Sequence, residues 1–175
     1  MFAQLGTDGL DWDHVDVFQV DERVAPDGDE DRNLTHIGAN LPDAALERLR
    51  PMPVTADDLE SAATRYEAEL PKPLDLVHLG IGPDGHTASL VPGDPVLEVT
   101  DRLVAPTGGE YQGRRRMTLT YPALAAARRL FWLVAGEDKR DALAKLLAGD
   151  PSIPAGRVEA PDGLVLADEA AAPRD

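Results

Sequence analysis

Residues 74–82 restrict the fold most, because this segment is almost continuously apolar and ends in glycines. Such a run is typical of a β-strand covered on both faces, as in parallel sheets. Further short apolar runs predict strands at residues 15–20, 103–105, 117–120, 130–135 and 164–167. The chain therefore contains the repeated buried strands of an open sheet.

Helical patterns separate these strands. Residues 55–70 predict a helix that starts in a capping box of Thr55 and Asp58, and residues 138–147 predict another that stops at 149–151. The alanines at 170–172 predict a short terminal helix. Strands alternating with helices predict an α/β fold with a mostly parallel, open, Rossmann-like sheet and helices on both faces. We expect residues 1–175 to form a single domain.

Composition excludes several classes of protein. With 32 acidic and 17 basic residues, the net charge is −15, which argues against a nucleic-acid partner. No apolar run approaches the ~20 residues of a membrane helix, so we expect no membrane partner and a cytoplasmic location. Without cysteine there is no disulfide, thiolate metal site or thiol nucleophile.

Chemistry is expected where the strands end, because open α/β sheets bind ligands beyond the carboxyl ends of their strands. Three such ends carry charged residues, at 21–23, 82–87 and 136–139. In the second, His86 is suited to act as a general base near neutral pH, and Asp84 is placed to orient it. The alternative is that residues 83–85 form a plain turn and that His86 is a surface residue.

The sequence of residues 80–93 resembles the hallmark loop GxGPDGHTASLFPG of 6-phosphogluconolactonases, with Val91 in place of the aromatic residue. Four further segments are similar to family motifs in the same order. Residues 21–33 resemble DERxVP…SN, with Arg32 in place of the usual serine. Residues 116–120 resemble RxTLT, 136–139 resemble GxxK, and 154–158 resemble PASRV with Gly156 in place of serine.

This resemblance implies hydrolysis of 6-phosphoglucono-δ-lactone to 6-phosphogluconate, in the oxidative pentose phosphate route, without a cofactor or a metal. It implies that His86 activates water and later protonates the ring oxygen, while Asp84 orients it. Implied substrate-binding residues are Arg23, Asp21, Gly85, Lys139, Arg116 and Arg157. Arg23 and Lys139 are the candidates for the phosphate.

Glucosamine-6-phosphate deaminases are the main alternative, because they share the Asp-Gly-His sequence of the loop. They carry a glutamate that assists ring opening where this chain has Val91, and DEY where this chain has residues 21–23. Both differences favour the lactonase.

Members of the family begin with a further strand and a GGSTP-like phosphate loop, which have no counterpart in this chain. We therefore expect an N-terminally truncated domain. Three interpretations remain open: a fragment or late start, a natural short form that pairs with another chain, and a catalytically inactive sugar-phosphate-binding module. A monomer or a homodimer is expected.

Overall fold

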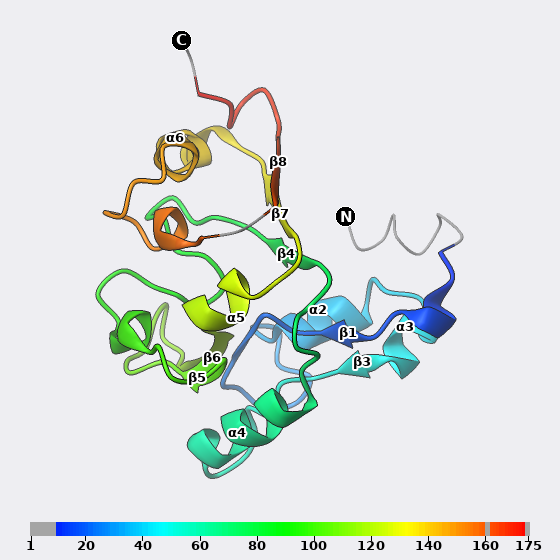
Figure 1. The fold of residues 1–175 in the computed structure, drawn as a ribbon. Helices are drawn as coiled ribbons and strands as arrows, with labels where there is room; N and C mark the ends of the chain where they lie inside the picture. Colours follow the sequence, from blue (N-terminus) through cyan, green and yellow to red (C-terminus); the bar gives the residue numbers. More distant parts are fainter. Residues whose placement is uncertain (1–9, 160–161, 174–175) are drawn as a thin grey trace.

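The computed structural model describes residues 10–159 and 162–173, which form three small sheets with short helices around them (Figure 1). The largest parallel sheet has the order β4-β7-β8, from β4 (Val77–Leu79), β7 (Leu130–Val134) and β8 (Gly163–Ala167). The predicted cover on both faces of residues 74–81 is wrong in part, since Leu76 is 58% exposed. The reason is that, within residues 10–159 and 162–173, β4 pairs with β7 alone and no strand lies along its other edge.

Two further sheets lie below this one in Figure 1. In the first, β1 (Val17–Phe18) runs parallel to β3 (Leu49–Arg50). In the second, β6 (Arg116–Leu119) pairs antiparallel with both β2 (Asp21–Arg23) and β5 (Val104–Pro106). The α/β class is confirmed, and three of the five ladders formed by the described residues are parallel. The antiparallel sheet was not predicted. Its β2–β6 pairing joins segments far apart in the sequence, and apolar patterns do not give the direction in which β5 and β6 pair.

The first strand was predicted at residues 15–20 and is shorter in the structure, and residues 21–23, which were expected to follow its end, form a strand of their own. Residues 17–18 pair with β3, whereas residues 21–23 pair with β6, and the Val20 carbonyl accepts a hydrogen bond from the Leu119 amide at 2.8 Å. This change carries the chain from the parallel to the antiparallel sheet. It also brings the carboxyl end of the first strand beside β6.

A groove of about 780 Å³ lies between β1 and β4. Its lining includes residues 14–21 and 74–78 and is mostly apolar. Val15 and Leu76 contribute exposed apolar surface there. The sheets on its two sides thus present unpaired strand edges to one groove.

Helix α4 (Leu59–Glu69) corrects one prediction, since its N-cap is Asp58 and no capping box starts at Thr55. The Asp58 carboxylate accepts hydrogen bonds from the amides of Glu60 and Ser61. Helix α6 (Arg140–Leu147) follows the 3-10 turn η3 (Glu137–Lys139). The predicted terminal helix at residues 170–172 does not form. Residues 169–171 make a turn instead, in which the Asp168 carboxylate accepts the Ala171 amide.

The other helical elements are short connections. They are η1 (Trp12–His14), α2 (Asn33–Gly38), α3 (Asp43–Glu47), η2 (Pro95–Glu98), α5 (Tyr121–Ala125) and η4 (Ala155–Arg157). Among the described residues, no helix is long and apolar enough to cross a membrane.

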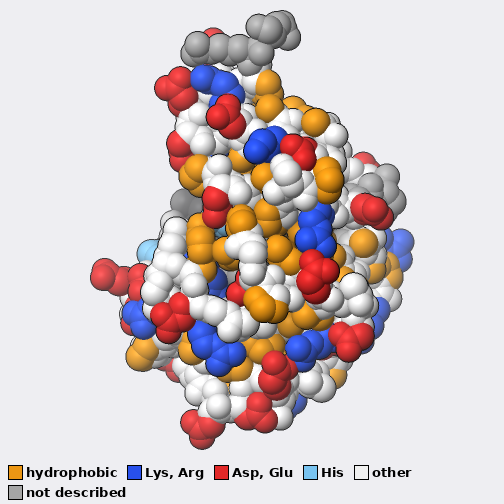
Figure 2. All heavy atoms as spheres, turned by 90° about the vertical axis from the view of Figure 1, so that its left-hand side faces the viewer, with side chains coloured by type: hydrophobic (Ala, Val, Ile, Leu, Met, Phe, Trp, Pro, Cys, Tyr) orange, Lys and Arg blue, Asp and Glu red, His pale blue; other side chains and the backbone are white. Residues whose placement is uncertain are grey.

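One apolar core joins the sheets. Its most deeply buried members include Leu79, Leu90, Met117, Leu124 and Leu130, which are at most 1% exposed. On the surface shown in Figure 2, acidic and basic side chains are interspersed with apolar ones. The net negative charge of the chain therefore does not prevent Lys and Arg side chains from clustering locally.

A buried ion pair between Glu22 and Arg32 lies between β2 and the start of α2. Glu22 is fully buried and lies 3.1 Å from Arg32 Nε, and its carboxylate accepts the amides of Asn33 and Leu34 at the start of α2. Burial alone would raise the pKa of Glu22, but hydrogen bonds from Gln19 and from these amides lower it overall. Glu22 is therefore held as a carboxylate that ties β2 to α2.

Candidate active site

The glycine-rich loop after β4 holds His86 in place. The Gly82 amide donates to the His86 carbonyl, and the Gly85 amide donates to the Gly82 carbonyl, each at 2.9 Å. A Cβ on Gly82 would lie 2.0 Å from His86 Nδ1 and 2.6 Å from Asp84 Oδ1. Glycine is thus required at position 82 because the imidazole occupies the space of a side chain.

Gly85 has φ +82°, a left-handed conformation that favours glycine. A Cβ there would lie 2.5 Å from Ile153, and the Gly85 carbonyl accepts the Ala155 amide. Both backbone polar groups of Gly85 are therefore occupied within the protein. In this structure Gly85 shapes the loop and packs it against residues 153–155.

His86 and Asp84 form the pair that the sequence predicted. His86 Nδ1 lies 2.6 Å from Asp84 Oδ1, and the His86 amide also donates to this oxygen at 3.2 Å. Burial alone would raise the pKa of Asp84, but the hydrogen bonds from His86 and Tyr111 lower it overall. Because an ionised carboxylate only accepts hydrogen bonds, Nδ1 is the ring nitrogen that donates to Asp84, and in the neutral imidazole this leaves the lone pair on Nε2. This is the tautomer that a general base needs.

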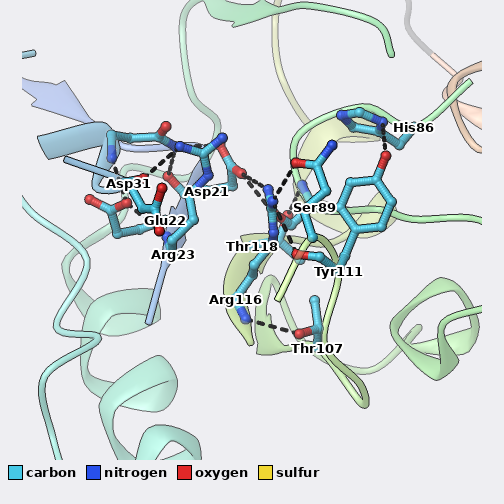
Figure 3. A network of polar contacts seen from close by, with 12 residues as sticks. Asp21, Glu22, Arg23, Asp31, His86, Ser89, Thr107, Tyr111, Arg116 and Thr118 are labelled. Atoms are coloured by element: carbon cyan, nitrogen blue, oxygen red, sulfur yellow. Dashed lines mark hydrogen bonds and ion pairs between the residues drawn. The ribbon is translucent and has the colours of Figure 1, made fainter. Parts of the chain in front are cut away.

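Tyr111 joins this pair and was missed by the sequence analysis. Its hydroxyl donates to Asp84 Oδ2 at 2.9 Å and lies 3.3 Å from His86 Nδ1, and Figure 3 shows the phenol turned toward His86. Burial raises the pKa of Tyr111, and the adjacent Asp84 raises it further. No motif surrounds Tyr111, so its only sequence signal is a glycine-flanked loop just before β6.

A cavity of about 290 Å³ lies beside His86 and is lined by residues from β2, β4 and β6, among them Asp21, Arg23 and Arg116. The structure thus brings three of the predicted substrate-binding residues together with His86. The Nε atoms of both arginines are buried and have no hydrogen-bond partner in the part of the chain that the structure describes. Such guanidinium groups suit an anionic ligand.

The two guanidinium groups also oppose one another. Burial, and next the charge of Arg23, lowers the pKa of Arg116, while Asp21 acts in the opposite direction. The nearest carboxylate oxygen, Asp21 Oδ2, is 3.9 Å from Arg116 Nη1. An anion in this cavity would relieve the repulsion between the arginines.

The carboxylate of Asp21 accepts hydrogen bonds from two side chains of the protein. One carboxylate oxygen accepts Asn33 Nδ2 at 3.0 Å, and the other accepts the Ser89 hydroxyl at 2.7 Å. Burial raises the pKa of Asp21, whereas the Ser89 hydrogen bond and the two arginines act against the rise. Asp21 therefore connects β2 to the start of α2 and to the loop that follows His86.

The remaining two predicted cations lie outside the lining of this cavity. Lys139 pairs with Asp138 at 2.9 Å, in the turn after β7. Arg157 pairs with Glu98 at 3.3 Å, donates to the Leu97 carbonyl and stacks on Tyr121. Arg157 and Lys139 therefore do not line the cavity, and each has a carboxylate partner.

Metal ligands are not grouped within residues 10–159 and 162–173, where no three His, Asp or Glu side chains converge as a metal site would need. The fold and the site together define an α/β protein with a histidine–aspartate pair beside a cavity lined by two arginines.

Comparison with known proteins identifies the family. Residues 1–167 match the family described as glucosamine-6-phosphate isomerases/6-phosphogluconolactonase. The chain belongs to this family, which confirms the resemblance of its loop and motifs.

Individual relatives agree with this assignment. A 6-phosphogluconolactonase of Streptomyces coelicolor is 36% identical over 173 residues, which cover 88% of this chain and 64% of that protein. One of Mycobacterium tuberculosis is 38% identical and covers 93% of this chain and 74% of that protein. The crystal structure of the 6-phosphogluconolactonase of Thermotoga maritima has a TM-score of 0.84 at 27% identity, over 95% of this chain and 79% of that one. The chain thus spans less than the full length of each.

Proposed function

We propose that this chain hydrolyses 6-phosphoglucono-δ-lactone to 6-phosphogluconate. The observation that carries the proposal is the His86–Asp84 pair, 2.6 Å apart, at the edge of a cavity that also holds Arg23 and Arg116. Similarity to proteins named 6-phosphogluconolactonase supports this substrate over other phosphorylated lactones.

His86 performs both proton transfers in the proposed reaction. Its Nε2 removes a proton from a water molecule as the water oxygen attacks C1 of the lactone. The tetrahedral intermediate then collapses, the bond between C1 and the ring oxygen breaks, and the imidazolium returns the proton to that oxygen. Asp84 stabilises the imidazolium and fixes the tautomer, as the acidic member of a catalytic triad does.

Arg23 and Arg116 are the proposed phosphate ligands. They lie on the adjacent strands β2 and β6, and their unpartnered Nε atoms would gain phosphate oxygens as acceptors. Lys139 stays a second candidate, which must first leave Asp138. A cytoplasmic location, a monomer or homodimer and the absence of a cofactor remain predictions from the sequence.

The deaminase alternative is less well supported. Val91, at the position of the deaminase glutamate, is 7% exposed and belongs to the apolar residues of the interior. A buried valine has no group to move a proton during ring opening. We therefore retain the lactonase as the single proposed activity.

The test is a measurement of proton release from freshly generated 6-phosphogluconolactone, with the spontaneous rate subtracted. We expect acceleration by the wild-type chain, and its loss in His86→Ala by about 10²–10⁴-fold. The matched control is His14→Gln, because His14 is exposed and pairs only with the exposed Asp11 in the structure. No acceleration by the folded wild-type chain would overturn the proposal and favour a module that binds sugar phosphates without catalysis.

A further inference from the structure

The hairpin at residues 111–114 brings Tyr111 to the acid–base pair. The Tyr111 amide donates to the Arg114 carbonyl at 2.9 Å, and the two central residues, Gln112 and Gly113, have φ of 54° and 77°. Positive φ at both central positions is typical of the tight type I′ turn. A tight turn restricts the backbone that carries the phenol.

Two arginines anchor this hairpin on different sides. Arg114 binds the carboxylates of Asp29 and Asp31, at 3.2 and 2.9 Å. Arg116 Nη2 donates to the Tyr111 carbonyl at 3.3 Å and to Gln112 Oε1 at 3.2 Å. The acidic loop at 27–31 therefore binds the hairpin.

Arg116 also supports the phenol ring itself. Its guanidinium carbon lies 5.0 Å from the centre of the Tyr111 ring, within cation–π range. The same ring meets the His86 imidazole edge to face, with centroids 5.2 Å apart and planes inclined by 62°. The phenol is thus enclosed between a cavity arginine and the proposed base, as Figure 3 shows.

We infer that Tyr111 is a positioning residue that holds the Asp84 carboxylate in line with His86. The Asp84 Oδ1 atom faces His86 Nδ1, and Oδ2 would be free to rotate if the Tyr111 hydroxyl did not bind it at 2.9 Å. With both oxygens bound, the carboxylate plane is fixed and so is the orientation of the His86 imidazole, which lines the cavity. This inference rests on the proposed lactonase activity for its kinetic consequence.

The electrostatics of the contact agree with this geometry. The Tyr111 hydrogen bond is among the causes that lower the pKa of Asp84, and Asp84 raises the pKa of Tyr111 in return. The groups facing Asp84 are His86 from its own loop and Tyr111 from the hairpin, and Arg116 faces Tyr111 from β6. Removal of either group should therefore shift the pKa of the other.

The test is Tyr111→Phe, which removes the hydroxyl and retains the ring. We expect kcat to fall about tenfold with KM unchanged within about twofold, because alignment is lost and binding is not. Tyr121→Phe is the matched control, because Tyr121 donates to the Pro154 carbonyl and has no contact with Asp84 or His86 in the structure. Its kcat is expected to stay at the wild-type value.

A second measurement needs no substrate. In Tyr111→Phe, the ¹³C titration midpoint of the Asp84 carboxyl is expected to move to higher pH, because a stabilising donor is lost. In Asp84→Asn, the titration midpoint of the Tyr111 phenol is expected to fall.

The two measurements separate the two proposals. An unchanged Asp84 midpoint in folded Tyr111→Phe, or an unchanged kcat, would overturn the role of Tyr111. An inactive wild-type chain whose Asp84 midpoint still shifts would instead refute the lactonase and leave the contact established.

Discussion

Replacement of Gly82 by alanine tests whether the position of His86 determines activity. The added Cβ would lie 2.0 Å from His86 Nδ1 and 2.2 Å from Cε1, whereas ordinary contact begins at 3.4 Å. The imidazole must therefore retreat by about 1.4 Å, and the 2.6 Å hydrogen bond to Asp84 breaks. A displacement of ~1 Å at a reacting group costs roughly 10²-fold in rate, so kcat/KM should fall by about that factor.

The fold should survive this change. Gly82 has no left-handed φ, so alanine fits its backbone, and crowding of this kind costs about 1–3 kcal/mol. Proton release from the lactone measures activity, and urea unfolding measures stability. Gly38→Ala is the control, because a Cβ at Gly38 meets no atom within 4 Å. A Gly82→Ala variant with kcat/KM within about threefold of wild type would refute the reasoning.

Three further predictions concern the anion cavity, the buried ion pair and the open edge of β4. Arg23→Met should raise KM for the lactone about tenfold with a smaller change in kcat, and an unchanged KM would exclude Arg23 as a phosphate ligand. Glu22→Gln should destabilise the protein by up to about 3–5 kcal/mol near neutral pH in urea unfolding, because the buried Arg32 then loses its buried carboxylate partner and keeps the exposed Asp27. The pKa of Glu22 is lower in the folded than in the unfolded state. Ionised Glu22 therefore adds to the free energy of unfolding above pH 4.5, and this stabilisation is lost as the pH falls below that value. The free energy of unfolding of Glu22→Gln should accordingly depend less on acid pH than that of the wild type. Leu76→Lys should change the free energy of unfolding by less than ~0.5 kcal/mol, because Leu76 is 58% exposed. Leu79→Ala should lower it by about 2–5 kcal/mol, because Leu79 is 1% exposed. Equal losses in urea unfolding would contradict the edge position of β4.

Local sequence patterns were sufficient for the loop at 80–93 and for most of the strands, but β2 and β3 were not predicted. An apolar run ending in glycines determines a strand followed by a turn, whatever the rest of the chain does. His86 and Asp84 are two residues apart, so one turn brings them into contact and the sequence could predict the pair. The N-cap of α4 was misplaced by three residues, because Thr55 and Asp58 are both good caps and only the backbone decides between them.

Contacts between distant segments could not be predicted in this way. The phenol of Tyr111 meets a loop 25 residues earlier, and its hairpin resembles many other glycine-rich turns. The pairing of β2 with β6 joins Arg23 to Arg116, which are 93 residues apart. Pairing of this range depends on the packing of the whole core and leaves no periodic trace in either segment.

The sequence by itself determined the α/β class, the glycine-rich turn and the identity of the histidine–aspartate pair, because each depends on neighbours along the chain. Only the tertiary structure decided which cations share the cavity with His86, namely Arg23 and Arg116, while Lys139 and Arg157 have carboxylate partners elsewhere. Tertiary structure also decided that Tyr111 completes the pair. The physical reason is that charge and hydrogen bonding act through space over a few ångströms, and only the folded chain sets which side chains come that close.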